Sequence, residues 1–265
     1  MDRIGFIGMG NMGSAMLKGA LNIFSAGDMI FYDINDEKCD EITKETHVLS
    51  AGSITECVKD CKYIVLAIKP QAYKEATSKI KEVLTSSHVV ISLAPTITIK
   101  QLSEMLDINA RIVRAMPNTP ALIGEGMTGL CARDNTFTEE ELEMVEKFFS
   151  SFGKCKFVSE TVMSAVVCAS CSSPAYVYMF IEALADSCVK YGMSRADAYE
   201  FAAQAVYGSA KMVLESGENP AALKDKVCSP GGTTIRAVEA LEENGFRNAI
   251  FKATKACYEK CEENN

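Results

Sequence analysis

The sequence predicts an α/β domain over residues 1–157, followed by an all-α domain over residues 158–265. Three observations lead to this prediction. Short apolar, β-branched runs alternate with helical stretches as far as residue 157. A glycine-rich turn follows the first of these runs directly, where a helix is expected to begin. Beyond residue 160 the strand pattern stops, and the remaining periodic segments have the spacing of helices.

Seven apolar runs in the first domain have the length and composition of strands. They are Arg3–Ile7, Met29–Tyr32, Tyr63–Ile68, His88–Leu93, Arg111–Ala115, Met127–Cys131 and Cys155–Val158. Helical stretches lie between several of them, for example Gly13–Asn22, Tyr73–Leu84 and Thr138–Phe149. Strands that alternate with helices build a mostly parallel sheet that carries helices on both faces.

Five helices are expected in the second domain, separated by breaks that contain glycine or proline. They are Thr161–Tyr191, Arg195–Ser216, Pro220–Val227, Thr233–Glu243 and Phe246–Glu262. The first is apolar nearly all round over Thr161–Ile181, so it needs packing partners on every side. Because roughly 110 residues of helix can hardly enclose it alone, we expect an all-α dimerisation domain and a homodimer or a multiple of dimers.

Composition and charge exclude several classes of protein. Of the 265 residues, 48% are apolar and 23% are charged, as in soluble globular proteins. The formal charge is 27 − 35 = −8 and the pI is near 5.0. An acidic surface argues against nucleic-acid binding and gives little attraction to anionic lipid. Neither an uninterrupted apolar run of about 18 residues nor a signal-peptide pattern occurs, so we expect no membrane span and no export.

Eleven cysteines are scattered along the chain. Without an export signal, we expect reduced thiols in the cytoplasm, most of them serving as small buried apolar groups. Cys168 and Cys171 have the CxxC spacing of zinc ligands, but a zinc site needs a second pair or nearby histidines. The two histidines, His47 and His88, lie in the other domain. We therefore expect helix-packing cysteines and no metal.

The turn over residues 8–13, GMGNMG, has the G-x-G-x-x-G spacing of a dinucleotide-binding loop. The motif is weak alone, but here it joins an expected strand to an expected helix. Gly8 permits the tight turn, Gly10 lets the backbone approach a pyrophosphate, and Gly13 lets helix and strand pack closely. Asn11 and Met12 complete the turn as further expected cofactor contacts, and the N–H groups at the start of the helix that follows favour phosphates. The first domain is therefore expected to be of Rossmann type; a glycine-rich turn without a ligand is the alternative.

Asp33 lies 20 residues beyond Gly13, at the end of the second expected strand. An acidic residue there accepts hydrogen bonds from the adenosine ribose of NAD. A 2′-phosphate at this place would face Asp33, Asp36 and Glu37, and like charges resist that placement. The sequence therefore favours NADH over NADPH; the alternative is that Asp33 only caps a turn.

Further cofactor contacts are expected where two other strands end. Ala67, Lys69 and Pro70 follow one strand, and Ala94 follows the next. Ligands of a doubly wound sheet bind beyond the carboxyl ends of its strands, so these residues face the nicotinamide half of the site. Lys69 is a candidate for a ribose hydroxyl or the substrate carboxylate, or else a solvated lysine. The segment 114–120, RAMPNTP, carries two prolines, as a shaped pocket wall requires.

The turn over residues 229–234, SPGGTT, opens an amphipathic helix. Gly231 and Gly232 expose successive N–H groups, and Ser229, Thr233 and Thr234 carry hydroxyls. This combination provides a seat for a small carboxylate. An ordinary helix start is the alternative, but a plain cap needs one Ser or Thr. We therefore expect these five residues to bind substrate.

The chain resembles the Δ1-pyrroline-5-carboxylate reductase family over essentially its whole length. The segments that carry the resemblance are Gly8–Gly13, Ala67–Gln71, Met116–Pro120, Pro174–Tyr176 and Leu223–Leu241. The last contains the SPGGTT turn, which is the family's own signature. The resemblance implies reduction of the ring C=N bond of pyrroline-5-carboxylate by NADH or NADPH to give L-proline. It also implies that no metal is used, and that interlocked dimers commonly assemble into decamers.

The same resemblance implies roles for particular residues. Gly231, Gly232 and Thr233 would hold the substrate carboxylate through backbone N–H groups. Thr234 would place its hydroxyl near the ring nitrogen, and Glu160 falls where a family acid approaches the substrate. Thr234 and Glu160 are therefore the expected catalytic residues.

Three departures from the family pattern are present, and two other functions compete. Cys171-Ser172-Ser173 stands for a Gly-Ser-Gly, Pro95-Thr96 for an Ala-Gly, and Lys226 for an asparagine. A 3-hydroxyacid dehydrogenase of the same plan needs a general base. From Glu160 to Val189 the chain has no Lys, Arg or His, which favours C=N over C=O chemistry. A non-catalytic dinucleotide-binding regulator is supported by the altered 171–173 stretch and opposed by the intact SPGGTT turn.

Overall fold

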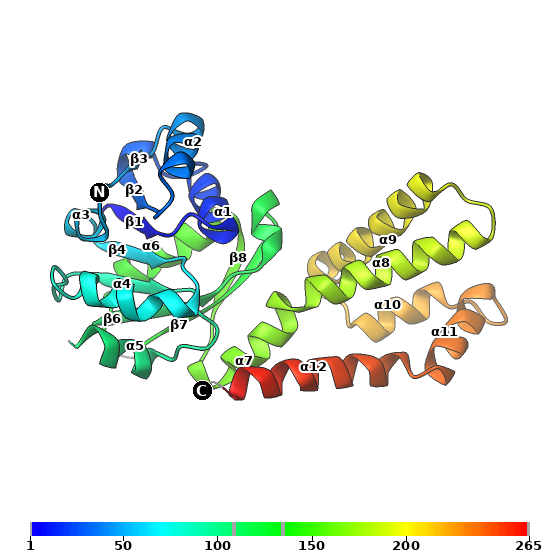
Figure 1. The fold of residues 1–265 in the computed structure, drawn as a ribbon. Helices are drawn as coiled ribbons and strands as arrows, with labels where there is room; N and C mark the ends of the chain where they lie inside the picture. The colour runs from blue at the N-terminus through cyan, green and yellow to red at the C-terminus, as the bar shows by residue number, and fades with distance from the viewer. Residues whose placement is uncertain (1, 108–109, 134–135, 264–265) are drawn as a thin grey trace. The chain divides into compact units, whose positions relative to one another are not determined.

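The computed structural model of the chain describes residues 2–107, 110–133 and 136–263. The chain forms two compact units, one of Met1–Ser172 with Cys257–Asn265 and one of Ser173–Ala256 (Figure 1). The change from strands to helices occurs near residue 158, as the sequence predicts, but the first unit extends further to Ser172. The reason is that Met163 and Val167 are buried in the apolar cluster on one face of the sheet.

The first unit contains an eight-stranded sheet in the order β3-β2-β1-β4-β5-β6-β7-β8. The strands are β1 (Ile4–Ile7), β2 (Met29–Tyr32), β3 (Leu49–Ser50), β4 (Tyr63–Leu66), β5 (Val89–Ser92), β6 (Arg111–Met116), β7 (Gly126–Ala132) and β8 (Gly153–Phe157). All pairs are parallel except β6 with β7. The seven expected strands are confirmed, with ends that differ by at most two residues. The sequence missed β3, because two residues are too few to show a period.

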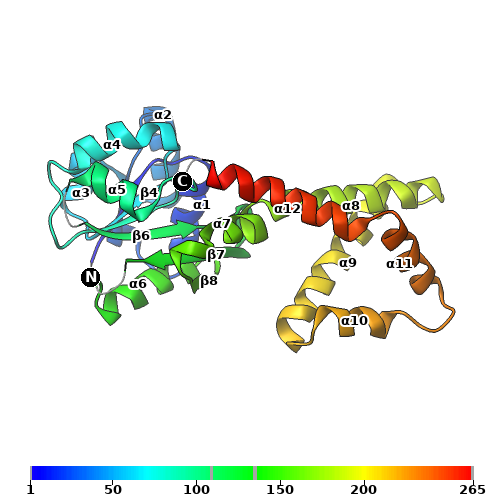
Figure 2. The same ribbon diagram turned by 90° about the horizontal axis from the view of Figure 1, so that it is seen from below.

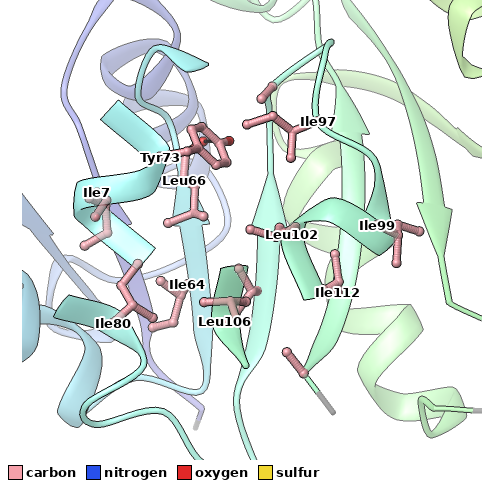
Figure 3. Packing of buried hydrophobic residues seen from close by; sticks show 14 of the residues in the cluster. Ile7, Ile64, Leu66, Tyr73, Ile80, Ile97, Ile99, Leu102, Leu106 and Ile112 are labelled. Carbon is pink, nitrogen blue, oxygen red and sulfur yellow. Dashed lines mark hydrogen bonds between the residues drawn. The ribbon is translucent and has the colours of Figure 1, made fainter. Parts of the chain in front are cut away.

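Helices cover both faces of this sheet (Figures 1 and 2). One face packs against α1 (Asn11–Ala20), α2 (Asp36–Thr46) and α6 (Glu139–Ser150). The other packs against α3 (Ile54–Lys59), α4 (Tyr73–Ile80) and α5 (Ile99–Leu106). Figure 3 shows this second layer, in which Tyr73 of α4 lies beside Leu66 of β4. The predicted α/β class of the first domain is confirmed.

The expected long helix after residue 160 is not one regular helix. It consists of a 3₁₀ turn (Glu160–Val162), α7 (Met163–Val166), a π-helical segment (Val167–Cys171) and α8 (Ser173–Lys190). In the π-helical segment the Ser172 N–H donates to the Val167 carbonyl, five residues back, at 2.9 Å. Pro174 follows closely, and because it has no N–H it removes one ordinary helical bond. The sequence showed the proline but not the change of helical period.

The second unit holds α8, α9 (Arg195–Ser216), α10 (Pro220–Val227), α11 (Thr233–Glu243) and most of α12 (Phe246–Glu262). The bounds of the last four are those that the sequence predicts. Helices α8 and α9 pack together, yet in the described chain the buried residues of this pair are all alanines, Ala185, Ala198 and Ala202. Large apolar side chains stay exposed, among them Phe201 at 68% and Phe251 at 74%. The unit thus lacks an apolar core of its own, as the sequence led us to expect.

One helical stretch of the described residues, Glu160–Lys190, is long and apolar enough to cross a membrane by length and composition. Its most apolar window is 11% buried. Core helices of soluble proteins pass the same test. The stretch is therefore an exposed apolar surface, and the test does not show what packs against it. The absence of a membrane span stays a prediction.

Candidate active site

The sheet order brings the carboxyl ends of β1, β4, β5 and β6 to one edge. Beyond β1 the chain turns toward β2 on one side, and β4 lies on the other side. Such a reversal of strand order is where doubly wound sheets bind ligands. The segments that follow these four strands are the glycine turn at residues 8–13 and the expected contact segments at 67–70, 93–95 and 117–120.

The three glycines of the turn have different surroundings. Gly8 has a φ of +97°, and a Cβ there would lie 2.6 Å from Ile68 Cγ2. At Gly13 a Cβ would lie 2.2 Å from the Gly8 carbonyl oxygen, so only glycine lets α1 approach the end of β1. At Gly10 a Cβ would meet no described heavy atom within 4 Å. Gly8 and Gly13 thus shape the turn, whereas Gly10 leaves its backbone open on the outside.

The N-terminus of α1 is suited to a phosphate group. Its N-cap is Gly10, which offers no side chain to bond the first N–H groups, and its first turn carries no acidic residue. The N–H groups of Asn11, Met12 and Gly13 are among those that a helix leaves without an internal partner. The positive end of the helix dipole adds to the attraction for an anion. The turn and helix therefore fit the pyrophosphate of a dinucleotide.

Asp33 closes this turn from the end of β2. Its Oδ2 accepts a hydrogen bond from Met9 N at 2.6 Å, and its Oδ1 accepts one from Asn35 N at 3.0 Å. The carboxylate therefore holds the glycine turn to the end of β2. Asp36 and Glu37 begin α2 close by and are exposed, so negative charge surrounds the position expected for the adenosine ribose.

A cavity of about 220 Å³ opens at the strand ends. Its lining consists of Met12, Ala67, Ile68, Leu93, Pro95, Met116, Pro117, Val167 and Cys171. The sequence had placed Met12 and Ala67 in the site and had described the 114–120 segment as a pocket wall. It did not place Val167 and Cys171 there. Pro174, three residues beyond Cys171, was the only local signal of the altered helix.

Three other expected contacts lie around this cavity without lining it. Lys69 and Pro70 are exposed at the start of a short 3₁₀ turn. Ala94 is buried, and its N–H donates to Ser92 Oγ at 3.4 Å. Their roles toward a cofactor stay predictions.

Glu160 has a local structural task. Its Oε1 accepts from Ile99 N at 2.8 Å and from Arg114 Nη1 at 3.2 Å. Arg114, which is buried, also donates from Nη2 to the Pro95 carbonyl at 2.5 Å. The pair thus holds the loop from β5 to α5, and Pro95 of this loop lines the cavity. The expected approach of Glu160 to the substrate stays a prediction.

The SPGGTT turn belongs to the second unit and begins α11. Gly231 has a φ of +70°, and Gly232 N donates to the Ser229 carbonyl at 3.0 Å. Gly232 is the N-cap of α11, without a side-chain cap, and Thr233 and Thr234 are its first two residues. An ordinary Ser or Thr cap is therefore not what this turn provides. Its N–H groups begin the helix as a carboxylate seat requires.

The thiols of the π-helical segment lie in a partly dehydrated setting. Burial raises the pKa of the Cys171 thiol to about 11, and burial also raises the pKa of Cys168. Both groups are therefore protonated at neutral pH. As small buried or partly buried thiols they suit helix packing, the role that the sequence predicts, and the absence of a metal stays a prediction.

Comparisons with known proteins cover nearly all of the chain. A family model described as pyrroline-5-carboxylate reductase dimerisation matches residues 160–264, and one described as NADP oxidoreductase, coenzyme F420-dependent, matches residues 3–96. Pyrroline-5-carboxylate reductase of Escherichia coli is 46% identical over 262 residues, which span 98% of this chain and 97% of that protein. The solved structure of the Plasmodium falciparum reductase with NADP bound is 34% identical, has a TM-score of 0.89, and matches over 99% of this chain and 98% of its own. The Coxiella burnetii reductase structure is 30% identical, with a TM-score of 0.93, over 100% and 98%.

Replacing Gly10 with valine should weaken cofactor binding while leaving the fold intact. A side chain at this position meets no described atom of the protein, but it occupies the space through which a pyrophosphate reaches the backbone. We expect the KM for the cofactor to rise about tenfold or more, which corresponds to roughly 1.4 kcal/mol. Gly27→Val is the matched control, because Gly27 is equally open but lies away from the turn. Equal cofactor affinity in Gly10→Val and wild type would contradict this placement of the nucleotide.

The purified protein should contain no stoichiometric zinc, and a chelator should not inactivate it. Structural zinc sites take four ligands, and the described residues bring no group of three or more His, Cys, Asp or Glu side chains together in a way that could hold a metal ion. Elemental analysis and activity after dialysis against EDTA measure this. A tightly held zinc would show that these thiols are ligands.

Proposed function

Because this chain belongs to the pyrroline-5-carboxylate reductase family, we infer that it reduces the ring C=N bond of 1-pyrroline-5-carboxylate with NAD(P)H to give L-proline, in proline biosynthesis. One observation carries this inference beyond family membership: an open glycine turn and an uncapped SPGGTT helix start occur in the same chain. The first suits a dinucleotide, and the second suits a small carboxylate. Neither a 3-hydroxyacid dehydrogenase nor a non-catalytic regulator is favoured by the relatives.

A steady-state assay of pyrroline-5-carboxylate with NADH and, separately, NADPH tests the function. We expect turnover with at least one of the two cofactors and proline as the product. Absence of turnover with both, in protein that binds either cofactor, would instead favour the regulator.

NAD(P)H, when bound, supplies the hydride for the reduction. The residues present fit such a cofactor. The N–H groups at residues 10–13 would hold its pyrophosphate, and Gly8 and Gly13 keep that turn in place. The mainly apolar walls from Met12, Ala67, Leu93 and Met116 would take the nicotinamide end and exclude water from it. Lys69, Pro70 and Ala94 are proposed as further contacts around this end.

The substrate is proposed to bind through the SPGGTT turn. The N–H groups of Gly231, Gly232 and Thr233 would hold the carboxylate at the start of α11, where the helix dipole adds attraction. Ser229 accepts the Gly232 N–H through its carbonyl and so keeps the turn closed. The Thr234 hydroxyl would hydrogen-bond the ring nitrogen as it passes from iminium to amine. Glu160 is proposed to act near the substrate, because it lies beside the loop that carries Pro95.

We propose NADH as the preferred cofactor. The support is the cluster of Asp33, Asp36 and Glu37 at the expected ribose position, where a 2′-phosphate meets like charge. The bound NADP in the Plasmodium falciparum relative belongs to that protein, so the choice for this chain is decided by measuring both cofactors.

The chain is proposed to work as a homodimer, with decamers as a larger assembly, in the cytoplasm. Exposed apolar side chains on α8, α9 and α12 support a partner subunit, and the family model matched to 160–264 is one of dimerisation. Residues 1–157 would bind the cofactor, and residues 158–265 the substrate and the partner. The cysteines, all buried or partly buried, suit a reducing compartment. No nucleic-acid or membrane partner is proposed.

Asp33→Ser should raise the KM for NADH about tenfold and improve the relative use of NADPH. The change removes an acceptor for the ribose hydroxyls together with a repulsive charge. The KM values and kcat for both cofactors measure this. Asp36→Ser is the control, since it removes a nearby charge but no bond to the glycine turn. A wild type that already prefers NADPH by a wide margin would show that Asp33 does not have this role.

Thr234→Ala should lower kcat/KM for pyrroline-5-carboxylate by roughly tenfold to a hundredfold. One hydrogen bond of about 0.5–1.5 kcal/mol, or up to about 3 kcal/mol when charged, is lost from the ring nitrogen. Cofactor affinity should change much less, because the phosphates bind the other domain. Ser78→Ala, an exposed hydroxyl on α4, is the control. Full activity, or equal losses for cofactor and substrate, would remove Thr234 from the substrate site.

A further inference from the structure

Two segments that are distant in sequence form one wall of the cavity at the strand ends. Met116 is the last residue of β6 and Pro117 follows it, whereas Val167 and Cys171 belong to the π-helical segment. The reaction as proposed above makes no use of Asn118, the residue that joins these segments.

Both ends of the Asn118 amide are occupied inside the first unit. Its Nδ2 donates to the Ser170 carbonyl at 2.9 Å, across 52 positions of the chain. Its Oδ1 accepts from Met127 N, also at 2.9 Å. The residue is 8% exposed, so these bonds form largely out of contact with water. The two bonds together fix which way the amide faces.

The Ser170 carbonyl needs a donor for a reason that lies in the sequence. In a regular helix it would accept from the N–H of the residue four places on, but that residue is Pro174, which has no N–H. A buried carbonyl left without a donor is costly. Asn118 supplies a donor at the place where the helix departs from the ordinary period. Such π-helical segments occur often at functional sites.

A second link joins the same two segments. The Cys171 thiol donates to the Pro117 carbonyl at 3.5 Å, and it lies 3.7 Å from the Met116 carbonyl. Asn118, which follows β6, and Cys171, in the π-helical segment, thus each supply a hydrogen bond that holds the two segments together. The cavity lies where these two segments meet.

We propose that Asn118 is a positioning residue for the reduction: its amide holds the π-helical segment against the end of β6 and so sets the width of the cavity that takes the nicotinamide and the substrate ring. The proposal rests on the proposed function, because it assigns that cavity to the reacting end of the cofactor.

Asn118→Asp tests the proposal, since it keeps the shape and an acceptor for Met127 N but replaces the donor to Ser170 with a carboxylate oxygen. At neutral pH the two oxygens repel each other, and the wall moves. We expect kcat/KM to fall about 10-fold to 100-fold and NADH affinity to fall about tenfold. ADP-ribose, which lacks the nicotinamide, should bind within about twofold of wild type by calorimetry, since its expected contacts are the glycine turn and Asp33 rather than this wall.

The pH dependence of kcat/KM distinguishes this role from a general loosening of the fold, which would not produce the same pH dependence. Burial beside a carbonyl raises the pKa of the introduced carboxyl above its usual value near 4. Once protonated, it again donates to the Ser170 carbonyl. The loss of kcat/KM relative to wild type should therefore become smaller as the pH falls from about 8 to about 5.5. Asn118→Ala carries no titratable group, so its kcat/KM should be about 3-fold to 10-fold below wild type without this recovery at low pH. If Asn118→Asp does not fold, Asn118→Ala serves in its place.

Asn22→Asp is the matched control, because Asn22 also donates from Nδ2 to a backbone carbonyl, that of Ser151, but at the end of α1 away from the cavity. It should leave NADH and ADP-ribose affinities unchanged. Wild-type values for Asn118→Asp, or equal losses of ADP-ribose and NADH affinity, would overturn the proposal. Failure of the proposed function is a separate result: the wild type would then not reduce pyrroline-5-carboxylate, whereas the two binding measurements would still report on Asn118.

Discussion

The close approach of α1 to the end of β1 is the constraint on which the candidate site depends. It is possible only because Gly13 has no side chain, since a Cβ there would lie 2.2 Å from the Gly8 carbonyl oxygen. Once α1 is held in this place, its uncapped N-terminus lies at the carboxyl edge of the sheet, beside the segments that follow β4 and β5. Asp33 then ties the turn to β2 through Met9 N. The proposed phosphate and ribose sites thus both depend on one packing condition.

The edge of the sheet becomes a pocket because other segments are held over it by polar contacts that are partly shielded from water. Arg114 and Glu160 hold the loop that carries Pro95, and Asn118 holds the π-helical segment that carries Val167 and Cys171. Apart from the ion pair between Arg114 and Glu160, these contacts use backbone groups outside the regular ladders: Ile99 N, the Pro95 carbonyl and the Ser170 carbonyl. Such groups must find partners when buried, and here the partners are side chains that position the pocket walls.

The second unit follows a different rule. Its helices bury alanines between α8 and α9 and leave large apolar side chains on the outside. A single chain therefore gains little apolar burial from packing this unit, and this observation supports the proposed partner subunit. The first residues beyond residue 160 are the exception, because Met163 and Val167 are buried on the sheet. These first turns therefore belong to the first unit, whereas the exposed apolar side chains lie in the second.

The sequence by itself determined the elements whose signals are local. All strands of the sheet except β3 have apolar runs, and four of the last five helices have clear breaks at both ends. The turn at residues 8–13 has glycines whose spacing reflects the room each one needs. The SPGGTT turn was equally visible, because two glycines and two threonines are more than a helix cap requires. Tertiary structure alone decided the π-helical segment, the task of Glu160 and the place of Cys171 in the pocket wall. These depend on contacts such as that between Asn118 and Ser170, which are 52 residues apart. No local period records such a contact, since it forms only when the folded sheet brings both segments to the same edge.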